Sequence, residues 1–269
     1  MKKLFLIDAY ALIFRSYYAF INRPMRNADG LNTSAVFGFV KFLNELIRRE
    51  QPHYLGVAFD PKGGNFRHEL YPAYKANRDA TPEDITAAVP YIKEVLEAMR
   101  IPVIEVPGYE ADDVIGTLSQ KAARDGYEVF MVTPDKDFGQ LIRPTVHIYK
   151  QRKGGEGIEV IGCEQLREHY GIGDPRQVID ILALWGDASD NIPGVPGIGE
   201  KSATKLVCEF GTVENLLDNT DKLKGKQREN IEKSADQIRL AKQLATIELD
   251  VPVEFVPERL VMETPDLDR

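Results

Sequence analysis

Short apolar runs alternate with segments of helical periodicity along the first part of the chain. Strands are predicted where the runs have strand length, at Lys3–Ile7, Tyr54–Phe59, Pro102–Val106, Glu128–Thr133 and Val146–Tyr149. Helices are predicted where apolar residues recur every three or four positions or where a turn opens a helical stretch, at 12–20, 35–46 and 110–124. This alternation is typical of an α/β fold.

Strands that alternate with helices pair in parallel through crossovers, and the helices then cover both faces of the sheet. Ligand sites in such sheets lie beyond the carboxyl ends of the strands. Asp8, Asp60 and Asp135 each follow a predicted strand directly or after a short turn. We therefore expect an acidic site at one edge of a mostly parallel sheet.

The pattern changes character twice along the chain. A loop rich in glycine and proline, PKGGNFRHELYPAYKANRDATP, follows Asp60, and loops of this length in compact domains are usually functional or mobile. After Pro175 short helical stretches dominate, so a boundary is expected near Gly173. The predicted organisation is a catalytic domain over 1–173, a helical DNA-binding subdomain over 174–250, and a tail or linker over 251–269.

The overall composition limits the classes of protein that fit. Hydrophobic residues make up 43% of the 269 positions, which is enough to close a core. A net charge of −8 is unusual for a protein that binds nucleic acid, because Lys and Arg supply most non-specific affinity for phosphate. The sequence contains no signal-peptide core and no run of transmembrane length, so we expect a cytoplasmic protein without membrane contact.

Carboxylates gather in three further places. Glu110, Asp112 and Asp113 open a predicted helix, where a single acid would simply favour the helix dipole, but three would repel one another without a cation. Asp135 and Asp137 follow a strand and could be an ordinary turn with a helix cap. The third group is the pair Asp187 and Asp190, which are spaced so that one helical turn would put both carboxylates on one side.

Together these acids indicate a metal site, although each group alone is weak evidence. Eight of them count as candidate ligands: Asp8, Glu110, Asp112, Asp113, Asp135, Asp137, Asp187 and Asp190. Eight oxygen ligands without paired histidines or a zinc-type cysteine spacing favour a hard cation, Mg²⁺ or Mn²⁺, over zinc. Two such ions about 4 Å apart can activate water and stabilise the leaving oxygen in phosphodiester hydrolysis. Setting these eight acids aside also leaves a balanced net charge, which permits DNA binding without supporting it.

Two basic segments offer contacts for DNA. The run Ile192–Lys201 has the G-V-P-G-I-G core of a helix-hairpin-helix motif, in which glycines let the backbone approach phosphate; a plain connector between helices is the alternative. The residues expected to hold the duplex are Gly194, Gly197, Gly199 and Lys201. The long loop interleaves Lys62, Arg67, Lys75 and Arg78 with Phe66, Tyr71 and Tyr74, as single-stranded ends require, unless the aromatic residues are there by chance.

Five ordered motifs resemble the 5′-nuclease family, which comprises flap endonucleases and the N-terminal domain of bacterial DNA polymerase I. They are FLIDAYALIFRSYYAF, FRHELYPAYKANR, YEADDVIGTL, TPDKDFGQL and GDASDNIPGVPGIGEKSA. The resemblance covers nearly the whole chain and implies a PIN-like (resolvase-like) core with a helical arch over the active site at about 62–90. One departure is Ala9 followed by Tyr10, where the family commonly has glycine after the first aspartate.

The resemblance also implies roles. Asp8, Glu110, Asp112 and Asp135 would form one metal group, and Asp113, Asp137, Asp187 and Asp190 would complete the second, with Asp60 nearby. Lys75 and Arg78 would contact the scissile phosphate and act in catalysis together with Asp8 and Asp113. Tyr74 would stack on a base, and Arg15 and Arg67 are grouped with the DNA contacts. A K⁺ ion is expected at the hairpin.

The substrates implied are 5′ flaps, 5′ ends and RNA primer–DNA hybrids, cut during replication and repair by a monomer. The C-terminal segment resembles the passage into the rest of the polymerase, so a covalently attached polymerase domain is expected. Two other functions stay open at this point. One is a non-catalytic binder of DNA junctions, which would gain nothing from a repulsive acid cluster. The other is a PIN-type ribonuclease, which usually lacks an arch and a helix-hairpin-helix.

Overall fold

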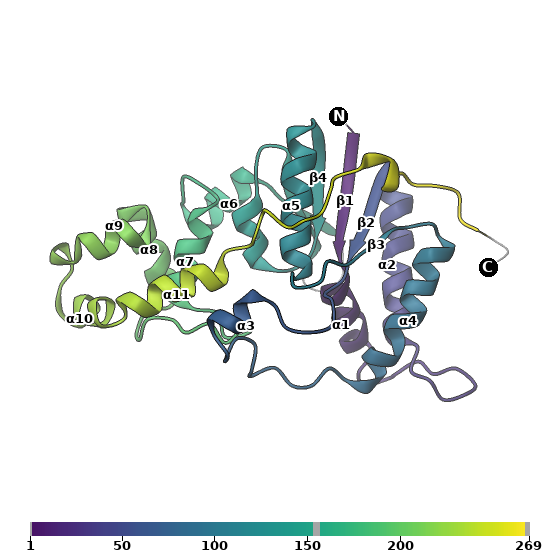
Figure 1. Cartoon of the computed structure of the whole chain (residues 1–269), viewed down its shortest axis with the longest axis horizontal. Helices are drawn as coiled ribbons and strands as arrows, with labels where there is room; N and C mark the ends of the chain where they lie inside the picture. The colour runs from purple at the N-terminus through teal and green to yellow at the C-terminus, as the bar shows by residue number, and fades with distance from the viewer. Residues whose placement is uncertain (1, 153–156, 267–269) are drawn as a thin grey trace.

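A computed structural model describes residues 2–152 and 157–266, and its centre is a six-stranded sheet (Figure 1). The strand order is β3-β2-β1-β4-β5-β6. The strands are β1 (Lys2–Asp8), β2 (Tyr54–Ala58), β3 (Val103–Ile104), β4 (Tyr127–Val132), β5 (Val146–Gln151) and β6 (Ile158–Ile161). The first five pair in parallel, and only β6 is antiparallel to its neighbour among these. The mostly parallel sheet predicted from the sequence is confirmed.

Alternate side chains of the central strand enter two separate cores. Phe5 and Ile7 pack with α1 (Ala9–Ala19), α2 (Ser34–Glu50) and α4 (Glu83–Ala98) on one face of the sheet. Leu4 and Leu6 pack on the other face against α5 (Ala111–Arg124). Because successive strand residues point to opposite faces, an unbroken apolar run such as Leu4–Ile7 is what a strand covered on both sides requires.

Three elements differ from the sequence prediction. The strand expected over 102–106 is only the two residues of β3, and the antiparallel edge strand β6 was not expected at all. The segment predicted as an arch, 62–90, contains the short helix α3 (Phe66–Leu70), a run of turns, and the start of α4. Pro90 lies inside α4 without ending it. The loop-like composition of this segment concealed α3, whose first turn is capped by the Asn65 side chain.

The C-terminal part is helical and shares its core with α5. Its helices are α6 (Cys163–Tyr170), α7 (Gln177–Trp185), α8 (Glu200–Phe210), α9 (Val213–Asp218), α10 (Gly225–Lys233) and α11 (Ala235–Ala245), with 3-10 turns at Thr220–Lys222 and Pro257–Arg259. A further 3-10 turn, Lys136–Leu141, lies between β4 and β5. One continuous apolar cluster runs from Val114 through Ile181 to Leu206. The two parts are therefore packed as one body rather than joined by a free linker.

The segment after α11 returns along the α/β core, as the yellow chain in Figure 1 shows. Leu260 accepts a hydrogen bond from the Leu55 amide at 2.8 Å, and the Met262 amide donates to the His53 carbonyl at 3.0 Å. Val251 and Leu260 are buried. The tail or linker expected over 251–269 is thus docked on the core at Val251 and Leu260, and the Asp266 amide donates to the Ala98 carbonyl, although residues 263–266 are exposed. Its last three residues lie outside the described ranges. No helix within those ranges is long and apolar enough to cross a membrane.

Candidate active site

Three aspartates lie where parallel strands end, and nearby backbone or side-chain donors fix each carboxylate. Asp8 ends β1, caps α1 and accepts hydrogen bonds from the Ala11 amide at 3.2 Å and the Thr133 hydroxyl at 3.1 Å. Asp60 follows β2 and accepts from the Ala111 amide at 2.7 Å. Asp135 follows β4 and caps the 3-10 turn by accepting from the Asp137 amide at 2.9 Å.

These carboxylates share one electrostatic site. Burial raises the pKa of Asp8 to about 7, and the negative charges of Asp60 and Asp135 contribute. Burial and the charge of Glu110 raise the pKa of Asp60 in the same way. The pKa of Asp112 is raised well above its ordinary value by burial and by neighbouring acids. Acids from separate segments therefore repel one another across the carboxyl edge of the sheet, as the strand-end pattern predicted.

The donor set and one unsatisfied atom fit a hard cation. Asp137 is 9% exposed, and its Oδ1 has no hydrogen-bond partner among the described residues. Burial and the charge of Asp135 raise the pKa of Asp137 well above its ordinary range. The Lys136 ammonium, 3.7 Å from Oδ1, is too distant to donate a hydrogen bond to it. A buried carboxylate oxygen without a donor is expensive unless a cation or its water reaches it. The ligands at this edge are all oxygens, which Mg²⁺ and Mn²⁺ prefer.

Cationic side chains, rather than carboxylates alone, fill the space between these acids. No group of three His, Cys, Asp or Glu residues in the described ranges is arranged closely enough to hold a metal by itself. Lys136 instead contacts Asp187 at 2.5 Å and lies 3.7 Å from Asp137. Hydrogen bonds from Lys136 and Ser189 lower the pKa of Asp187 in spite of its burial. Asp187 therefore stays ionised as part of an ion pair.

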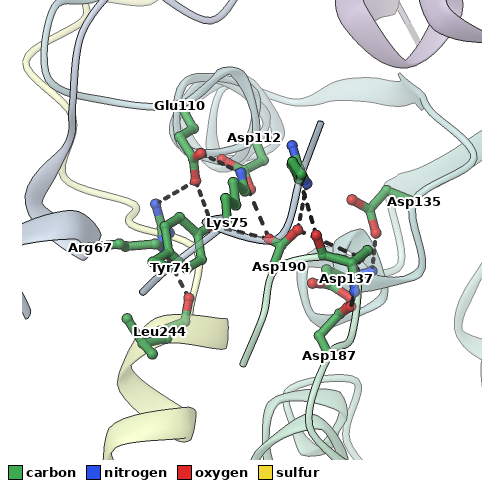
Figure 2. Close-up of polar contacts among 12 residues, drawn as sticks. Arg67, Tyr74, Lys75, Glu110, Asp112, Asp135, Asp137, Asp187, Asp190 and Leu244 are labelled. Carbon is green, nitrogen blue, oxygen red and sulfur yellow. Dashed lines mark hydrogen bonds and ion pairs between the residues drawn. The ribbon is translucent and has the colours of Figure 1, made fainter. Parts of the chain in front are cut away.

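The segment Tyr71–Arg78, which we call the strap, carries cationic and polar side chains to the acids. Figure 2 shows two of its residues, Tyr74 and Lys75, beside Glu110 and Asp190. The Lys75 ammonium contacts Glu110 and lies 3.7 Å from Asp190, while the Arg78 guanidinium lies 2.5 Å from Asp190. The two cations predicted to meet the scissile phosphate therefore lie directly on two predicted metal ligands. Nearby acids, above all Glu110 for Lys75 and Asp190 for Arg78, raise the pKa of both cations against the effect of burial, so both remain charged.

The strap is held on the loop that follows α7. The Lys75 amide donates to the Asp190 carbonyl at 2.9 Å, and the Asn191 side chain donates to the Ala73 carbonyl at 2.7 Å. Lys75 and Asn191 both have left-handed backbones, with φ of 55° and 56°. This conformation is costly for residues other than glycine and persists where the surrounding contacts enforce it. Two loops remote in sequence thus fix each other beside the acids.

Tyr74 departs from the role expected for it. Its side chain is only 3% exposed, and its hydroxyl donates towards Glu110 at 2.9 Å and Asp190 at 3.1 Å. A ring buried in this way does not offer a face to an unpaired base. The aromatic spacing in the loop indicated stacking, but in the structure Tyr74 anchors the strap to the acids.

Asp113 and Arg67 also differ from expectation. Asp113 is completely buried, and both of its oxygens accept hydrogen bonds from the Arg67 guanidinium, at 2.7 and 2.9 Å. The same oxygens accept from the Glu248 and Glu110 amides. Asp113 is therefore enclosed by protein donors and is not placed to ligate a metal. Arg67 is 1% exposed and cannot reach a phosphate from this position. The pair can stay inside the protein because its two parallel hydrogen bonds offset the free-energy cost of removing both charges from water.

The predicted DNA contacts in the hairpin before α8 differ in their surroundings: some are exposed, and one is packed against α7. Gly197 and Gly199 are exposed, Gly199 caps α8 without a side-chain bond to the first amides, and Lys201 is exposed on the first turn. These groups can approach an anion. Gly194 instead packs on the end of α7, where a Cβ would lie 1.9 Å from the Trp185 carbonyl oxygen. Its glycine is required by the packing of the chain itself.

Several neighbours of the acids were missed by the sequence reasoning. Lys136 pairs with Asp187, and Thr133 donates to Asp8. A cleft of about 500 Å³ opens beside Asp135, with Lys150 and Tyr170 in its wall. Lys136 could have been suspected from its position between two acids, whereas nothing local marks Lys150 or Tyr170. Arg15 lies half-buried on α1, near Thr133 and Lys150, and makes no ion pair in the described part of the chain.

A parallel sheet with carboxylates at its carboxyl edge, a cationic strap over them and a helical hairpin alongside defines a nuclease of the resolvase-like class. The comparisons agree. Residues 3–171 match the model of the 5′-3′ exonuclease N-terminal resolvase-like domain, and residues 173–268 match that of the 5′-3′ exonuclease C-terminal SAM fold. The chain belongs to the 5′-3′ exonuclease family, which confirms the enzyme class and fold expected from its motifs.

Curated relatives and solved structures agree with this assignment. The chain is 42% identical over its full length to DNA polymerase I of Bacillus caldotenax, and 42% identical over 94% of its length to DNA polymerase I of Bacillus subtilis. It spans only 30% and 28% of those two relatives.

Among solved structures, the chain is similar to T5 5′-exonuclease with bound divalent metal ions (zinc). The match covers 91% of the present chain and 89% of the T5 5′-exonuclease chain. Its TM-score is 0.76 at 24% identity. The catalytic core of Rad2 in complex with DNA substrate covers 99% of this chain, and the match covers 85% of that one, with a TM-score of 0.61 at 20% identity. At such identities these two matches support the fold alone.

Proposed function

We propose that this chain is a divalent-metal-dependent 5′-3′ exonuclease and 5′-flap endonuclease that hydrolyses phosphodiester bonds in branched or 5′-ended DNA. One observation carries the proposal. Lys75 forms an ion pair with Glu110, and Arg78 forms one with Asp190. The cations suited to bind a phosphate are therefore in direct contact with acids suited to bind a metal. A phosphate bridging to metal ions held by those acids would meet the two cations without a large movement of the strap.

The proposed metal ligands are the predicted acids other than Asp113, whose two oxygens are occupied by Arg67 and by backbone amides. Asp8, Glu110, Asp112 and Asp135 would hold one ion, and Asp137, Asp187 and Asp190 would serve the second or its waters, with Asp60 nearby. Mg²⁺ or Mn²⁺ bound there would lower the pKa of a water and offset charge on the phosphate. Lys75 and Arg78 would leave their carboxylate partners for the phosphate oxygens and stabilise the charge that develops on them.

The duplex contacts lie to the side of the acids. Gly197, Gly199 and Lys201 would hold the backbone of the duplex at the hairpin, where the resemblance also predicts K⁺. Arg15 would reach the strand near the carboxyl edge of β4. We propose that the protein acts as a monomer. We also propose that a polymerase domain is attached to it, as in the relatives named DNA polymerase I, and that RNA primers are further substrates. A cytoplasmic location accords with this role.

A labelled 5′-flap DNA incubated with and without Mg²⁺ tests the proposal. We expect cleavage only with the metal, and no turnover by Asp135→Asn, which should still bind the flap in Ca²⁺. Lys41→Ala is the control, since Lys41 is exposed on α2 and its ion pair is with Glu45 on the same helix. Binding without cleavage in Mg²⁺ would favour the junction binder, and faster cutting of plain single-stranded RNA would favour the ribonuclease.

A further inference from the structure

Arg67 has every N–H of its guanidinium occupied. Its Nε donates to the Leu244 carbonyl at 3.0 Å, one terminal nitrogen donates to Glu110 and Asp113, and the other donates to Asp113 and the Thr246 carbonyl. A guanidinium carries five such donors in a fixed fork. This single side chain therefore joins α3 at the base of the strap, the first turn of α5 and the end of α11.

Glu110 is the carboxylate at which this network meets the acids. Its Oε2 accepts from Arg67 at 3.2 Å and from the Tyr74 hydroxyl at 2.9 Å, and its Oε1 contacts Lys75. The Glu110 amide donates to Asp113 at 3.1 Å. Both the backbone and the side chain of Glu110 are therefore fixed by the Arg67–Asp113 pair. Oε1 is the oxygen left pointing towards the strap cation, as Figure 2 shows.

We propose that the Arg67–Asp113 pair is a positioning device that holds Glu110 in the orientation needed for the metal. The inference rests on the proposed function and deepens it. Asp113 then acts through Arg67 and the Glu110 amide, not as a ligand. Because Arg67 also binds the Leu244 and Thr246 carbonyls, the same pair sets where the end of α11 lies relative to the acids.

The chemistry of the pair distinguishes this role from simple stability. Residues that orient metal ligands typically change metal affinity or activity by about 10- to 100-fold when they are removed. A buried ion pair, by contrast, can often be exchanged for apolar groups of similar volume without loss of stability, whereas removal of one partner is strongly destabilising. Exchange of both partners together therefore separates orientation of Glu110 from maintenance of the fold.

The first experiment compares Arg67→Met/Asp113→Asn with wild type. Methionine replaces the buried cation by an apolar chain, and the amide that replaces the Asp113 carboxylate is uncharged but still accepts a hydrogen bond from the Glu248 or Glu110 amide. We expect thermal unfolding of the metal-free protein within a few degrees of wild type, Mn²⁺ affinity about 10- to 100-fold weaker by electron paramagnetic resonance, and kcat reduced by a similar factor with little change in KM. The matched control is Arg239→Met/Asp236→Asn, which makes the same exchange at an exposed pair on α11 and should alter none of these.

Arg67→Lys is the second variant, because it keeps the buried charge but loses the bidentate fork. We expect the same weakening of Mn²⁺ binding. A third measurement uses the unchanged protein: the Arg67 Nε–H signal in nuclear magnetic resonance should exchange slowly and shift on addition of Mg²⁺, whereas that of Arg239 should not.

Wild-type Mn²⁺ affinity and kcat in either folded variant would overturn the proposal, as would an Arg67 signal unmoved by Mg²⁺. Failure of the proposed function has a different signature, since wild type would then not cleave a 5′ flap in Mg²⁺. If wild type cleaves and the double variant still binds Mn²⁺ normally, only the positioning role is lost.

Discussion

Individual residues at the carboxyl edge are defined by the charges around them. Asp8 is the last residue of β1, where burial and the neighbouring charges of Asp60 and Asp135 oppose its ionisation. Its folded-state pKa of about 7 exceeds the ordinary value of 3.8. A group with a raised pKa contributes full stability below its unfolded pKa and loses it as the pH rises through the folded pKa. Ionisation of Asp8 therefore lowers the free energy of unfolding of the metal-free protein at neutral and alkaline pH.

Replacing Asp8 by asparagine should remove this loss of stability. Each unit of pKa shift corresponds to about 1.4 kcal/mol, so Asp8→Asn should stabilise the metal-free protein by a few kcal/mol at pH 8. The gain should fade as the pH is lowered to 5, where the native Asp8 is protonated. Thermal unfolding in a chelator at both pH values measures this. An equal change in melting temperature at pH 5 and pH 8 would contradict the prediction.

Lys75 is the residue whose loss should affect chemistry most among the strap cations. Its ammonium lies between Glu110 and Asp190, where a phosphate held by metal ions would arrive. Removal of one charge-stabilising donor commonly costs about 10²- to 10³-fold in kcat, and we expect a loss of this order for Lys75→Ala in single-turnover cleavage of a 5′ flap. Lys41→Ala, which removes an exposed lysine paired with Glu45 on α2, should cleave at a rate close to wild type.

At the scale of elements, the hairpin and the strap are both positioned by backbone contacts that side-chain chemistry does not reveal. The hairpin lies against α7, where the Val195 amide donates to the Leu184 carbonyl at 2.8 Å. It also contacts α11, from which the Gln237 side chain donates to the Gly194 carbonyl at 2.8 Å. The glycines of one motif therefore do different work. Gly194 permits close packing, whereas Gly199 leaves the first turn of α8 open to an anion.

The two glycines should respond differently to a methyl group. Gly194→Ala places a Cβ 1.9 Å from a backbone carbonyl, so the hairpin must separate from α7, and both melting temperature and affinity for duplex DNA should fall. Gly199→Ala meets nothing within 4 Å and should leave the melting temperature nearly unchanged. Differential scanning fluorimetry and DNA titration in Ca²⁺ compare the two. A Gly194→Ala protein as stable as Gly199→Ala would refute this account of the packing.

At the scale of the whole molecule, the C-terminal segment that follows α11 connects the helical part to the α/β core. It leaves α11, donates to Asp113 through the Glu248 amide at 2.8 Å, and continues along the core to contact β2. Leu260 is 5% exposed and lies over Gly56, whereas its neighbour Val261 is 41% exposed. The segment is thus part of the core, and it also touches the network behind Glu110.

Leu260 and Val261 form a matched pair for testing this docking. Leu260→Ala should cost about 2–5 kcal/mol, the usual range for a buried leucine. Val261→Ala should stay within about 0.5 kcal/mol, as exposed substitutions generally do. Chemical denaturation of the two variants measures the difference. Similar midpoints for both would mean that the segment is not docked in solution.

The sequence by itself was sufficient for the parallel part of the sheet and for the three aspartates at its strand ends. Unbroken apolar runs such as Leu4–Ile7 require a strand buried on both faces, and parallel strands bring their carboxyl ends to one edge. The convergence of Asp8, Asp60 and Asp135 follows from local pattern and topology alone. The family was equally recognisable, because its motifs are continuous in sequence.

Only the tertiary structure decided which charged residues face the site and which face one another. Arg67 and Asp113 lie 46 positions apart and look like a DNA contact and a metal ligand, yet they neutralise each other inside the molecule. Tyr74, Gly194 and the segment after α11 likewise depend on partners remote in the chain. Burial and pairing are properties of the packed whole, since a side chain's partner is chosen by how distant elements meet, and local sequence does not contain that information.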